Sequence, residues 1–367
     1  MHRSIVATCA AACIIASLST SQHAQAQRGP RPGVTEGDFV MRDFKFTDGS
    51  TLPELKIHYA TLGKPRKEAD GKVHNAVIIM HGTTGSGTGF LGASFGGQLF
   101  GPGQLLDTAS HFIILPDGIG TGRSSKPSDG LHAKFPHYGY EDMVTAQYRL
   151  VTEGLGLNHL LIVMGTSMGC MHSWIWGERY PDFMDGLVPL ACIPTQITGR
   201  NRIMRQFIAS AIRSDPAYNN GDYTTPPVWG LRAATEMLFM MQSVPMQQVK
   251  QYPTRDAADK FADDYIQRQV RTIDANDFLF QFEASRDYDP SGKLELITAP
   301  VLAINSADDQ VNPPELGLME KLMPRVKNGR YVLIPISDQT RGHGTHSLPA
   351  IWGSYFGEFL RQIGPKR

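Results

Sequence analysis

Two serines of the chain stand at the centre of the pattern Gly-x-Ser-x-Gly, which can present a serine hydroxyl as a nucleophile. Ser167 lies in the stretch GTSMG, and Ser94 lies in the stretch GASFG. The pattern alone is a weak signal, because a chain rich in Gly and Ser produces it by chance. The surroundings of each serine must decide which one could carry acyl-transfer chemistry.

The surroundings favour Ser167. It follows the apolar run LLIVM, residues 160–164, and precedes a stretch that can open a helix. A catalytic serine of this kind occupies a strained turn between a buried strand and a helix, where flanking glycines let the backbones approach. Ser94 lies in a Gly-rich run, residues 82–97, which is typical of a surface loop. We predict Ser167 as the nucleophile; the alternative is a tight turn with an idle hydroxyl.

A serine hydroxyl needs a base to take its proton and an acid to orient that base. Of the twelve histidines, His343 and His346 follow the last apolar run, RYVLIP. Asp308 and Asp309 follow the run before it, PVLAIN. The chain order Ser, Asp, His fits a nucleophile that is positioned by a parallel sheet. We predict His343 as the base, with His346 as the alternative, and these residues leave the choice of aspartate open.

Two other interpretations of this C-terminal loop carry less weight. His343 and His346 could bind a metal ion, but the sequence offers no complementary cluster of carboxylates and histidines. Asp338, in the same loop, is interpreted as a solvated turn residue. We therefore expect neither a metal nor a cofactor.

The negative charge that forms during acyl transfer needs backbone N–H donors aimed at it. One donor should be the N–H of Met168, at the start of the helix that follows Ser167. The other should be the N–H of Thr83, in the loop HGTTG after the apolar run AVIIM. His81, which opens this loop, is expected to shape it and not to act as a base.

Short apolar runs separated by helix-length segments predict an α/β fold, with a mostly parallel sheet covered by helices on both faces. The stretches GDFVMRDFKF and LKIHYATLG flank the turn residues 47–50 and predict an N-terminal hairpin. The later runs are AVIIM, HFIIL, LLIVM, GLVPLA, PVLAIN and RYVLIP.

One interval breaks this alternation. Residues 195–290 contain helix-like stretches such as LRAATEMLFMMQ and DDYIQRQVRTI but no convincing strand. We predict a helical lid there, inserted between the sixth and seventh strands, with a core made of residues 27–194 and 291–367. The methionines of the lid are expected to pack.

The N-terminus predicts export. Basic residues His2 and Arg3 precede an uncharged run, and Ala24-Gln25-Ala26 supplies a small-x-small cleavage pattern. Residues 1–26 are therefore expected to be a cleaved signal peptide, and the mature protein to be periplasmic or secreted; the alternative is a disordered tail.

Composition limits the partners. With 35 basic and 35 acidic residues and no basic stripe, nucleic acid is not an expected partner. No apolar run after residue 26 reaches membrane length, so we expect no membrane association after cleavage. Cleavage would leave Cys170 and Cys192, which we expect as two buried thiols, with a disulfide as the alternative.

Longer stretches resemble a known family, the homoserine O-acetyltransferase branch of the α/β hydrolases. GTSMGCMHSWIWGERYPD is similar to the family's GGSMGGMQALEWA-x-x-YPD, and FPHYGYEDMVTAQ, SDPAYNNGDY and DDQVNPPE match further blocks in order. The likeness runs from about Asp38 to the C-terminus. It implies the α/β-hydrolase fold, an acyl-enzyme on Ser167, and Asp309 as the acid, because Asp309 to Pro314 has the family's spacing D-x-x-x-P-P.

Two departures from the family bear on the acyl acceptor. The family's catalytic His is followed by Asp, where this chain has Gly344, and the family's substrate-binding Arg is replaced here by Ala209. Each charged hydrogen bond contributes about 1.5 to 3 kcal/mol, so the loss of both favours water over an amino acid as acceptor. We expect an exported serine hydrolase that cleaves carboxylic esters or related acyl substrates. The alternatives are an O-acyltransferase with a different acceptor and a catalytically idle binding module; a homodimer is left open.

Overall fold

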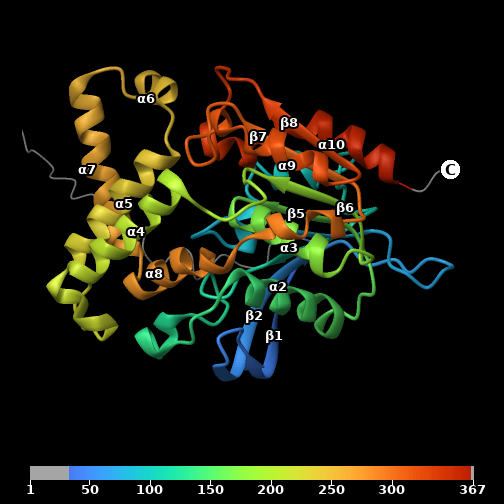
Figure 1. The fold of residues 1–367 in the computed structure, drawn as a ribbon, viewed down its shortest axis with the longest axis horizontal. Coiled ribbons are helices and arrows are strands. Elements are labelled where there is room, and N and C mark those ends of the chain that lie inside the picture. Colours follow the sequence, from blue (N-terminus) through green and yellow to red (C-terminus); the bar gives the residue numbers. More distant parts are fainter. Residues whose placement is uncertain (1–32, 365–367) are drawn as a thin grey trace, which may run out of the picture.

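An eight-stranded sheet organises the chain (Figure 1) in the order β1-β2-β4-β3-β5-β6-β7-β8. The computed structural model describes residues 33–364, so the predicted signal peptide lies outside the described residues. The strands are β1 (Val34–Lys45), β2 (Thr51–Leu62), β3 (Ala76–Met80), β4 (Phe112–Pro116), β5 (Leu160–Thr166), β6 (Met184–Leu190), β7 (Val301–Ser306) and β8 (Gly329–Ile334).

Neighbouring strands from β4 to β8 across the sheet run parallel. Every residue of β3, β4 and β5 is buried, as expected for parallel strands that are covered on both faces. The predicted N-terminal hairpin is confirmed: β1 pairs with β2 antiparallel, and β2 continues the sheet antiparallel to β4.

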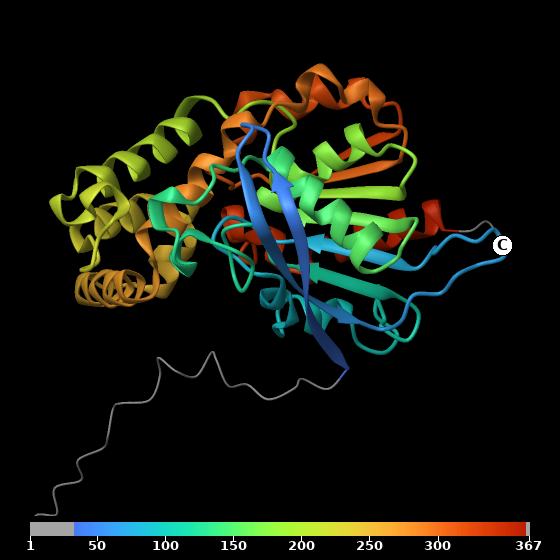
Figure 2. The same ribbon diagram turned by 90° about the horizontal axis from the view of Figure 1, so that it is seen from below.

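Side chains alternate between two cores because successive residues of a strand point to opposite faces. In β3, Ile78 belongs to one core and Ile79 to the other. Helices α2 (Tyr140–Arg149) and α3 (Met168–Arg179) cover the first face, while α1 (Gly96–Leu99) and α10 (Pro349–Ile363) cover the second. Figure 2 shows helices on both sides of the sheet. The short helix α9 (Leu318–Leu322) lies between β7 and β8 in the chain.

Between β6 and β7 the chain forms a separate group of helices beside the sheet, at the left of Figure 1. They pack on a third apolar core that includes Met204, Met241 and Phe278, whereas Met240 is exposed. The predicted lid, residues 195–290, contains these helices, and its status as a separate domain stays a prediction. In residues 33–364 no helix combines the length and the apolar character needed to cross a membrane. The inserted helices are α4 (Gly199–Ser214), α5 (Val228–Gln242), α6 (Pro245–Gln251), α7 (Arg255–Thr272) and α8 (Ala275–Glu283).

Candidate active site

Ser167 occupies the turn that joins β5 to α3, with φ 52° and ψ −108°. This is a strained conformation for a residue with a side chain, and it is held because the Ser167 N–H donates to the Leu190 carbonyl at 2.9 Å. The flanking positions require glycine because backbone carbonyl groups approach them closely. A Cβ on Gly165 would lie 1.9 Å from the Gly169 carbonyl oxygen, and a Cβ on Gly169 would lie 2.1 Å from the Met80 carbonyl oxygen.

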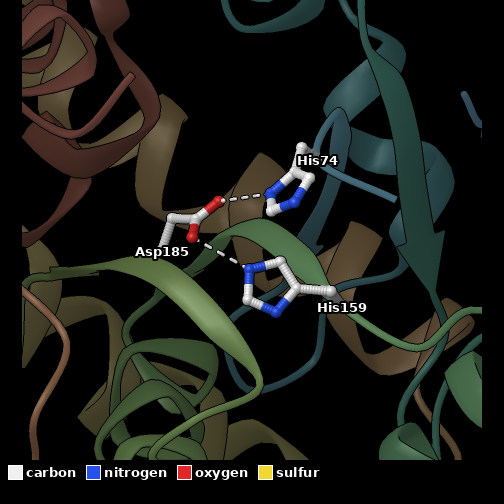
Figure 3. Close-up of side chains that lie close together, drawn as sticks. All are labelled: His74, His159 and Asp185. Carbon is white, nitrogen blue, oxygen red and sulfur yellow. Dashed lines mark hydrogen bonds and ion pairs between the residues drawn. The ribbon is translucent and has the colours of Figure 1, made fainter. Parts of the chain in front are cut away.

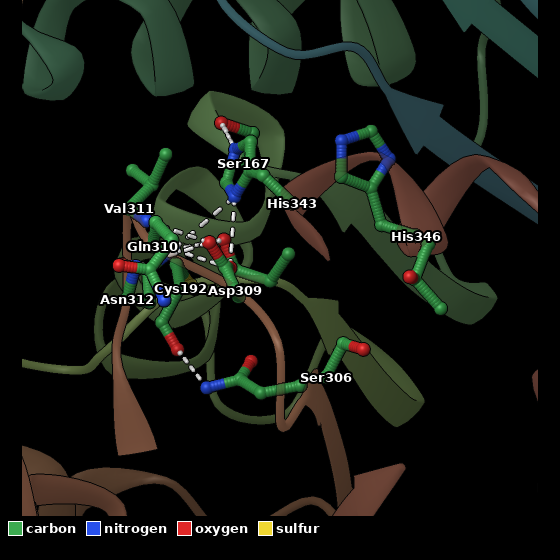
Figure 4. Close-up of polar contacts among 12 residues, drawn as sticks. Ser167, Cys192, Ser306, Asp309, Gln310, Val311, Asn312, His343 and His346 are labelled. Atoms are coloured by element: carbon green, nitrogen blue, oxygen red, sulfur yellow. Dashed lines mark hydrogen bonds and ion pairs between the residues drawn. The ribbon is translucent and has the colours of Figure 1, made fainter. Parts of the chain in front are cut away.

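His343 connects this serine to a carboxylate (Figure 4). Its Nε2 lies 2.8 Å from Ser167 Oγ, and its Nδ1 lies 2.9 Å from Asp309 Oδ2. An ionised carboxylate only accepts hydrogen bonds, so Nδ1 carries the hydrogen and Nε2 is left to accept from the serine hydroxyl. The parallel sheet explains why Ser167, His343 and Asp309 come together. The carboxyl ends of β5, β7 and β8 lie at the same end of the sheet, and the three residues follow those strands.

Asp309 is fully buried and is held in its charged form. Burial raises its pKa, but the charge and hydrogen bond of His343, together with hydrogen bonds from Asn312 and Val311, outweigh burial and keep the pKa below its ordinary value. Asp308 points elsewhere, because its Oδ1 accepts a hydrogen bond from Ser306 Oγ. The structure therefore places Asp309, and not Asp308, against the histidine.

Asn312 is part of this arrangement and was missed by the sequence analysis. Its Nδ2 lies 3.2 Å from Asp309 Oδ2 and 3.0 Å from the carbonyl oxygen of Ala191, beyond the end of β6. The amide thus fixes one carboxylate oxygen of the acid relative to the strand beside the nucleophile. Its position three residues after the acid, in a turn closed by Pro313 and Pro314, was the available signal.

His346, the alternative base, does not reach the nucleophile. Its ring lies edge-on to that of His343, 5.2 Å between centroids, and its Nδ1 pairs with Ser347 Oγ at 2.8 Å. Burial, followed by the nearby charge of His343, lowers the pKa of His346 to about 3. His346 therefore stays neutral at ordinary pH and has no carboxylate partner. It packs against His343 and does not replace it as the base.

The two predicted oxyanion donors lie beside the serine. A Cβ on Gly82 would be 3.8 Å from Ser167 Oγ, which brings the loop that carries Thr83 next to the nucleophile. Within the described residues, neither the N–H of Thr83 nor that of Met168 donates to another group of the protein. Both amides are therefore available to a developing negative charge.

His81 shapes this loop, as its position predicts. Its Nδ1 donates to the Gly82 carbonyl at 2.8 Å, and its Nε2 accepts from the Gly118 N–H at 2.9 Å. These two bonds require a neutral ring, and burial lowers the pKa of His81 in agreement with them.

A cavity of about 680 Å³ opens onto Ser167 and His343. The inserted helices supply part of its wall, with Phe239 and Tyr265 as rings. Their other contributions to the wall are the amides Gln242, Gln247, Gln248 and Gln251.

The two positions that depart from the family differ in whether they line this cavity, and the second serine lies at its rim. Gly344 lines it, and a Cβ there would meet Arg341 at an ordinary 3.6 Å. Ala209 instead packs inside the core of the inserted helices. Ser94 lies in an exposed turn before α1, at the rim.

The inserted helices also hold the loop that carries His343. Gln247 of α6 donates to the carbonyls of Asp338 and Thr340, at 3.1 and 2.9 Å, and Lys250 pairs with the Asp338 carboxylate. Asp338 is exposed, as expected for a solvated turn residue, but it is also part of this contact.

Cys170 and Cys192 form a disulfide, so the expectation of two buried thiols is wrong. Cys170 lies in the first turn of α3 and Cys192 lies two residues beyond β6. Because β5 and β6 pair up to Thr166 and Leu190, the two Cα atoms come within 5.9 Å, a separation that a disulfide spans. The order of the strands allowed the two cysteines to be neighbours, but the sequence alone did not give the distance between their Cα atoms.

The fold and the site together define the class of protein. A mostly parallel sheet, a serine on a strained strand-to-helix turn, and an acid and a histidine after later strands form the arrangement of the α/β hydrolases. The alpha/beta hydrolase fold family matches residues 75–335 of the chain. The chain belongs to this family and is an enzyme.

Known relatives identify the branch. A probable acyltransferase of Methanothermobacter thermautotrophicus is 30% identical over 292 residues, which are 79% of this chain and 88% of the relative. The homoserine O-acetyltransferase of Haemophilus influenzae is 32% identical over 270 residues, 66% of this chain and 73% of the relative. The chain thus lies in the homoserine O-acetyltransferase-like branch, whose chemistry is acyl transfer or hydrolysis.

A solved structure shows the same fold. It is that of an acetylester hydrolase from Corynebacterium glutamicum, with a TM-score of 0.76 at 20% identity, and the match covers 90% of this chain and 95% of that one.

Proposed function

We propose that the protein is an exported serine hydrolase that cleaves a small carboxylic ester through an acyl-enzyme on Ser167. The observation that carries the proposal is the continuous relay from Ser167 Oγ to His343 and Asp309, which faces a cavity where Gly344 replaces the family's acidic residue. The acetylester hydrolase with a similar fold supports hydrolysis as a chemistry that this architecture accommodates.

The reaction follows from the atoms in place. His343 Nε2 takes the proton of the Ser167 hydroxyl while Oγ attacks the ester carbonyl, and the N–H groups of Thr83 and Met168 receive the oxyanion. Collapse breaks the ester bond, and the leaving alcohol takes the proton from His343. Water then attacks the acyl-serine with His343 again as base, which releases the acid and restores the hydroxyl.

A second function has support from the relatives. Homoserine O-acetyltransferase and the probable acyltransferase suggest that an alcohol, and not water, could accept the acyl group. Gly344 lacks the charge with which the family contacts an amino acid. Ala209 packs in the core of the inserted helices and supplies no charged contact either. An acyltransferase here would use a different alcohol as acceptor.

Partition of the acyl group distinguishes the two functions. Incubated with p-nitrophenyl acetate and excess homoserine, the protein should release p-nitrophenol and acetate in equal amounts, with no O-acetylhomoserine above the background. Graded alcohols in place of homoserine test other acceptors, and Ser167→Ala is the control that removes enzymatic turnover. Rapid O-acetylhomoserine formation, from the ester or from acetyl-CoA, would overturn the hydrolase assignment.

Export belongs to the same proposal. The uncharged N-terminal run and Ala24-Gln25-Ala26 support cleavage after Ala26. The N-terminal sequence of protein recovered from the periplasm or medium should begin at Gln27; recovery of uncleaved cytosolic protein alone would contradict it.

A further inference from the structure

Two histidines and an aspartate, His74, His159 and Asp185, lie close together (Figure 3). His159 directly precedes β5, Asp185 lies at the start of β6, and His74 precedes β3. Ser167 follows the other end of β5. The seven residues of β5 therefore separate the two sites by about 23 Å, at roughly 3.3 Å per residue.

The three side chains converge on one point. His159 Nε2 lies 2.9 Å from Asp185 Oδ1, and His74 Nδ1 lies 3.4 Å from Asp185 Oδ2. The nearest ligand atoms of the three residues all lie within 4.8 Å of one another. Tetrahedral ligands at 2.0 to 2.1 Å from zinc are about 3.3 Å apart. Both histidine–aspartate distances, 2.9 and 3.4 Å, are close to that spacing.

The outer contacts resemble those around a metal site. His74 Nε2 lies 2.8 Å from Asp70 Oδ2, on the far side of the ring from Asp185. A carboxylate on the second nitrogen is the usual way in which a metal-binding histidine is oriented and made a better ligand. A cation bound at Nδ1 requires the uncharged ring, whose one hydrogen then lies on Nε2 and donates to Asp70.

His159 directs its Nε2 to the same point. Only 4% of the residue is exposed, and its Nδ1 is buried without a hydrogen-bond partner, so its hydrogen bond is the one to Asp185. The side chains of His74 and Asp185 are 25% and 30% exposed. Solvent can therefore supply both a path for an ion and a water as fourth ligand.

We propose that His74, His159 and Asp185 bind one zinc ion, with Asp70 orienting His74. Two imidazoles and one carboxylate are ligands that zinc accepts, and a water completes the four. The ion would connect the segment before β3 to the starts of β5 and β6. It would therefore act on stability and not on the chemistry at Ser167. The proposal does not depend on the proposed function.

Zinc binding to tag-free protein, dialysed against EDTA and then against buffer, tests the proposal. Calorimetric titration and elemental analysis should give one zinc per chain. The melting temperature should rise by about 3 °C or more when free zinc exceeds the dissociation constant a hundredfold. Cobalt in place of zinc should give visible d–d absorption bands.

Variants locate the ion. His74→Gln and Asp185→Asn alter partly exposed side chains, and each should weaken zinc binding at least tenfold; Asp70→Asn should weaken it less. His111→Gln removes another partly buried histidine outside the cluster and should bind as the wild type does. Ester hydrolysis without zinc should be unchanged in all four variants, and this result would show that the variants fold. The proposal is wrong if the dialysed wild-type protein binds no stoichiometric zinc, or if His74→Gln and Asp185→Asn bind it normally.

Discussion

Ser167 is favoured over Ser94 as the nucleophile because its hydroxyl has a base beside it. Of the two serines, Ser167 has the strained turn and a histidine at 2.8 Å, so a fluorophosphonate should label Ser167 and leave Ser94 unmodified, as read by peptide mass spectrometry. His343→Ala should abolish labelling, whereas His346→Ala should largely preserve it. Asp309→Asn should lower turnover about 10³- to 10⁴-fold. A folded Ser167→Ala protein with wild-type labelling would place the nucleophile elsewhere.

Asn312 is predicted to be a positioning residue. Asn312→Ala removes the amide between Asp309 and the Ala191 carbonyl, which should lower kcat while leaving KM almost unchanged, because the amide holds the acid and lines no part of the cavity. We expect about a tenfold loss, equivalent to about 1.4 kcal/mol. Asn312→Asp keeps the shape but adds a negative charge, so it should not restore activity. Equal kcat for wild type and Asn312→Ala would show that Val311 and the Asn312 N–H hold Asp309 sufficiently.

Residue identities could be predicted where chain order and fold restrict them, and less well where geometry decides. Ser167 and His343 follow from the ends of strands, and the spacing to Pro314 selected Asp309 by resemblance. Asn312 was missed because a side-chain amide in a turn has no fixed role in sequence. The cluster of His74, His159 and Asp185 was missed because its members are far apart in the chain and meet only through strand order.

At the scale of elements, the disulfide ties the nucleophile helix α3 to the end of β6. The cysteines are 22 residues apart, and closing a loop of that size stabilises a fold by about 3 kcal/mol in the chain-entropy description. The double variant Cys170→Ala and Cys192→Ala should unfold in urea with a free energy lower by about that amount. Wild-type protein cleaved after Ala26 should show no reactive thiol under denaturing conditions, and two free thiols in that protein would contradict the disulfide.

The strands themselves were the most predictable elements. AVIIM coincides with β3, and LLIVM lies within β5, because an apolar run between polar segments has few other places in a parallel sheet. The inserted helices were predicted as helices, but their contact with the catalytic loop through Gln247 was not. A glutamine carries no sequence signal for the carbonyl that it will reach, even one as buried as Gln247.

At the scale of the whole molecule, the protein should lose stability as the pH falls below about 6.5, because it buries neutral histidines. Burial, and then the charge of His81, lower the pKa of His172 to about 3, while burial and His343 do the same for His346. A histidine in the unfolded chain takes up a proton near pH 6.5 and these do not, so the unfolded state gains protons and is favoured as the pH falls from 6.5 towards 3. Each histidine then contributes a loss of about 1.4 kcal/mol per pH unit, or about 2 kcal/mol at pH 5.

Glu178 acts in the opposite direction. Burial raises its pKa to about 8, so its contribution to stability is present below its ordinary pKa and is lost as the pH rises towards 8. A comparison of wild type with His172→Gln cancels this effect, because both proteins keep Glu178. Between pH 7.5 and 5.0, urea unfolding should show a fall in stability that is about 2 kcal/mol smaller in the variant, since glutamine takes up no proton. If the two proteins lose equal stability over this range, His172 is protonated within the fold, and its hydrogen bond from Gln147 to Nδ1 cannot be the one that the structure shows.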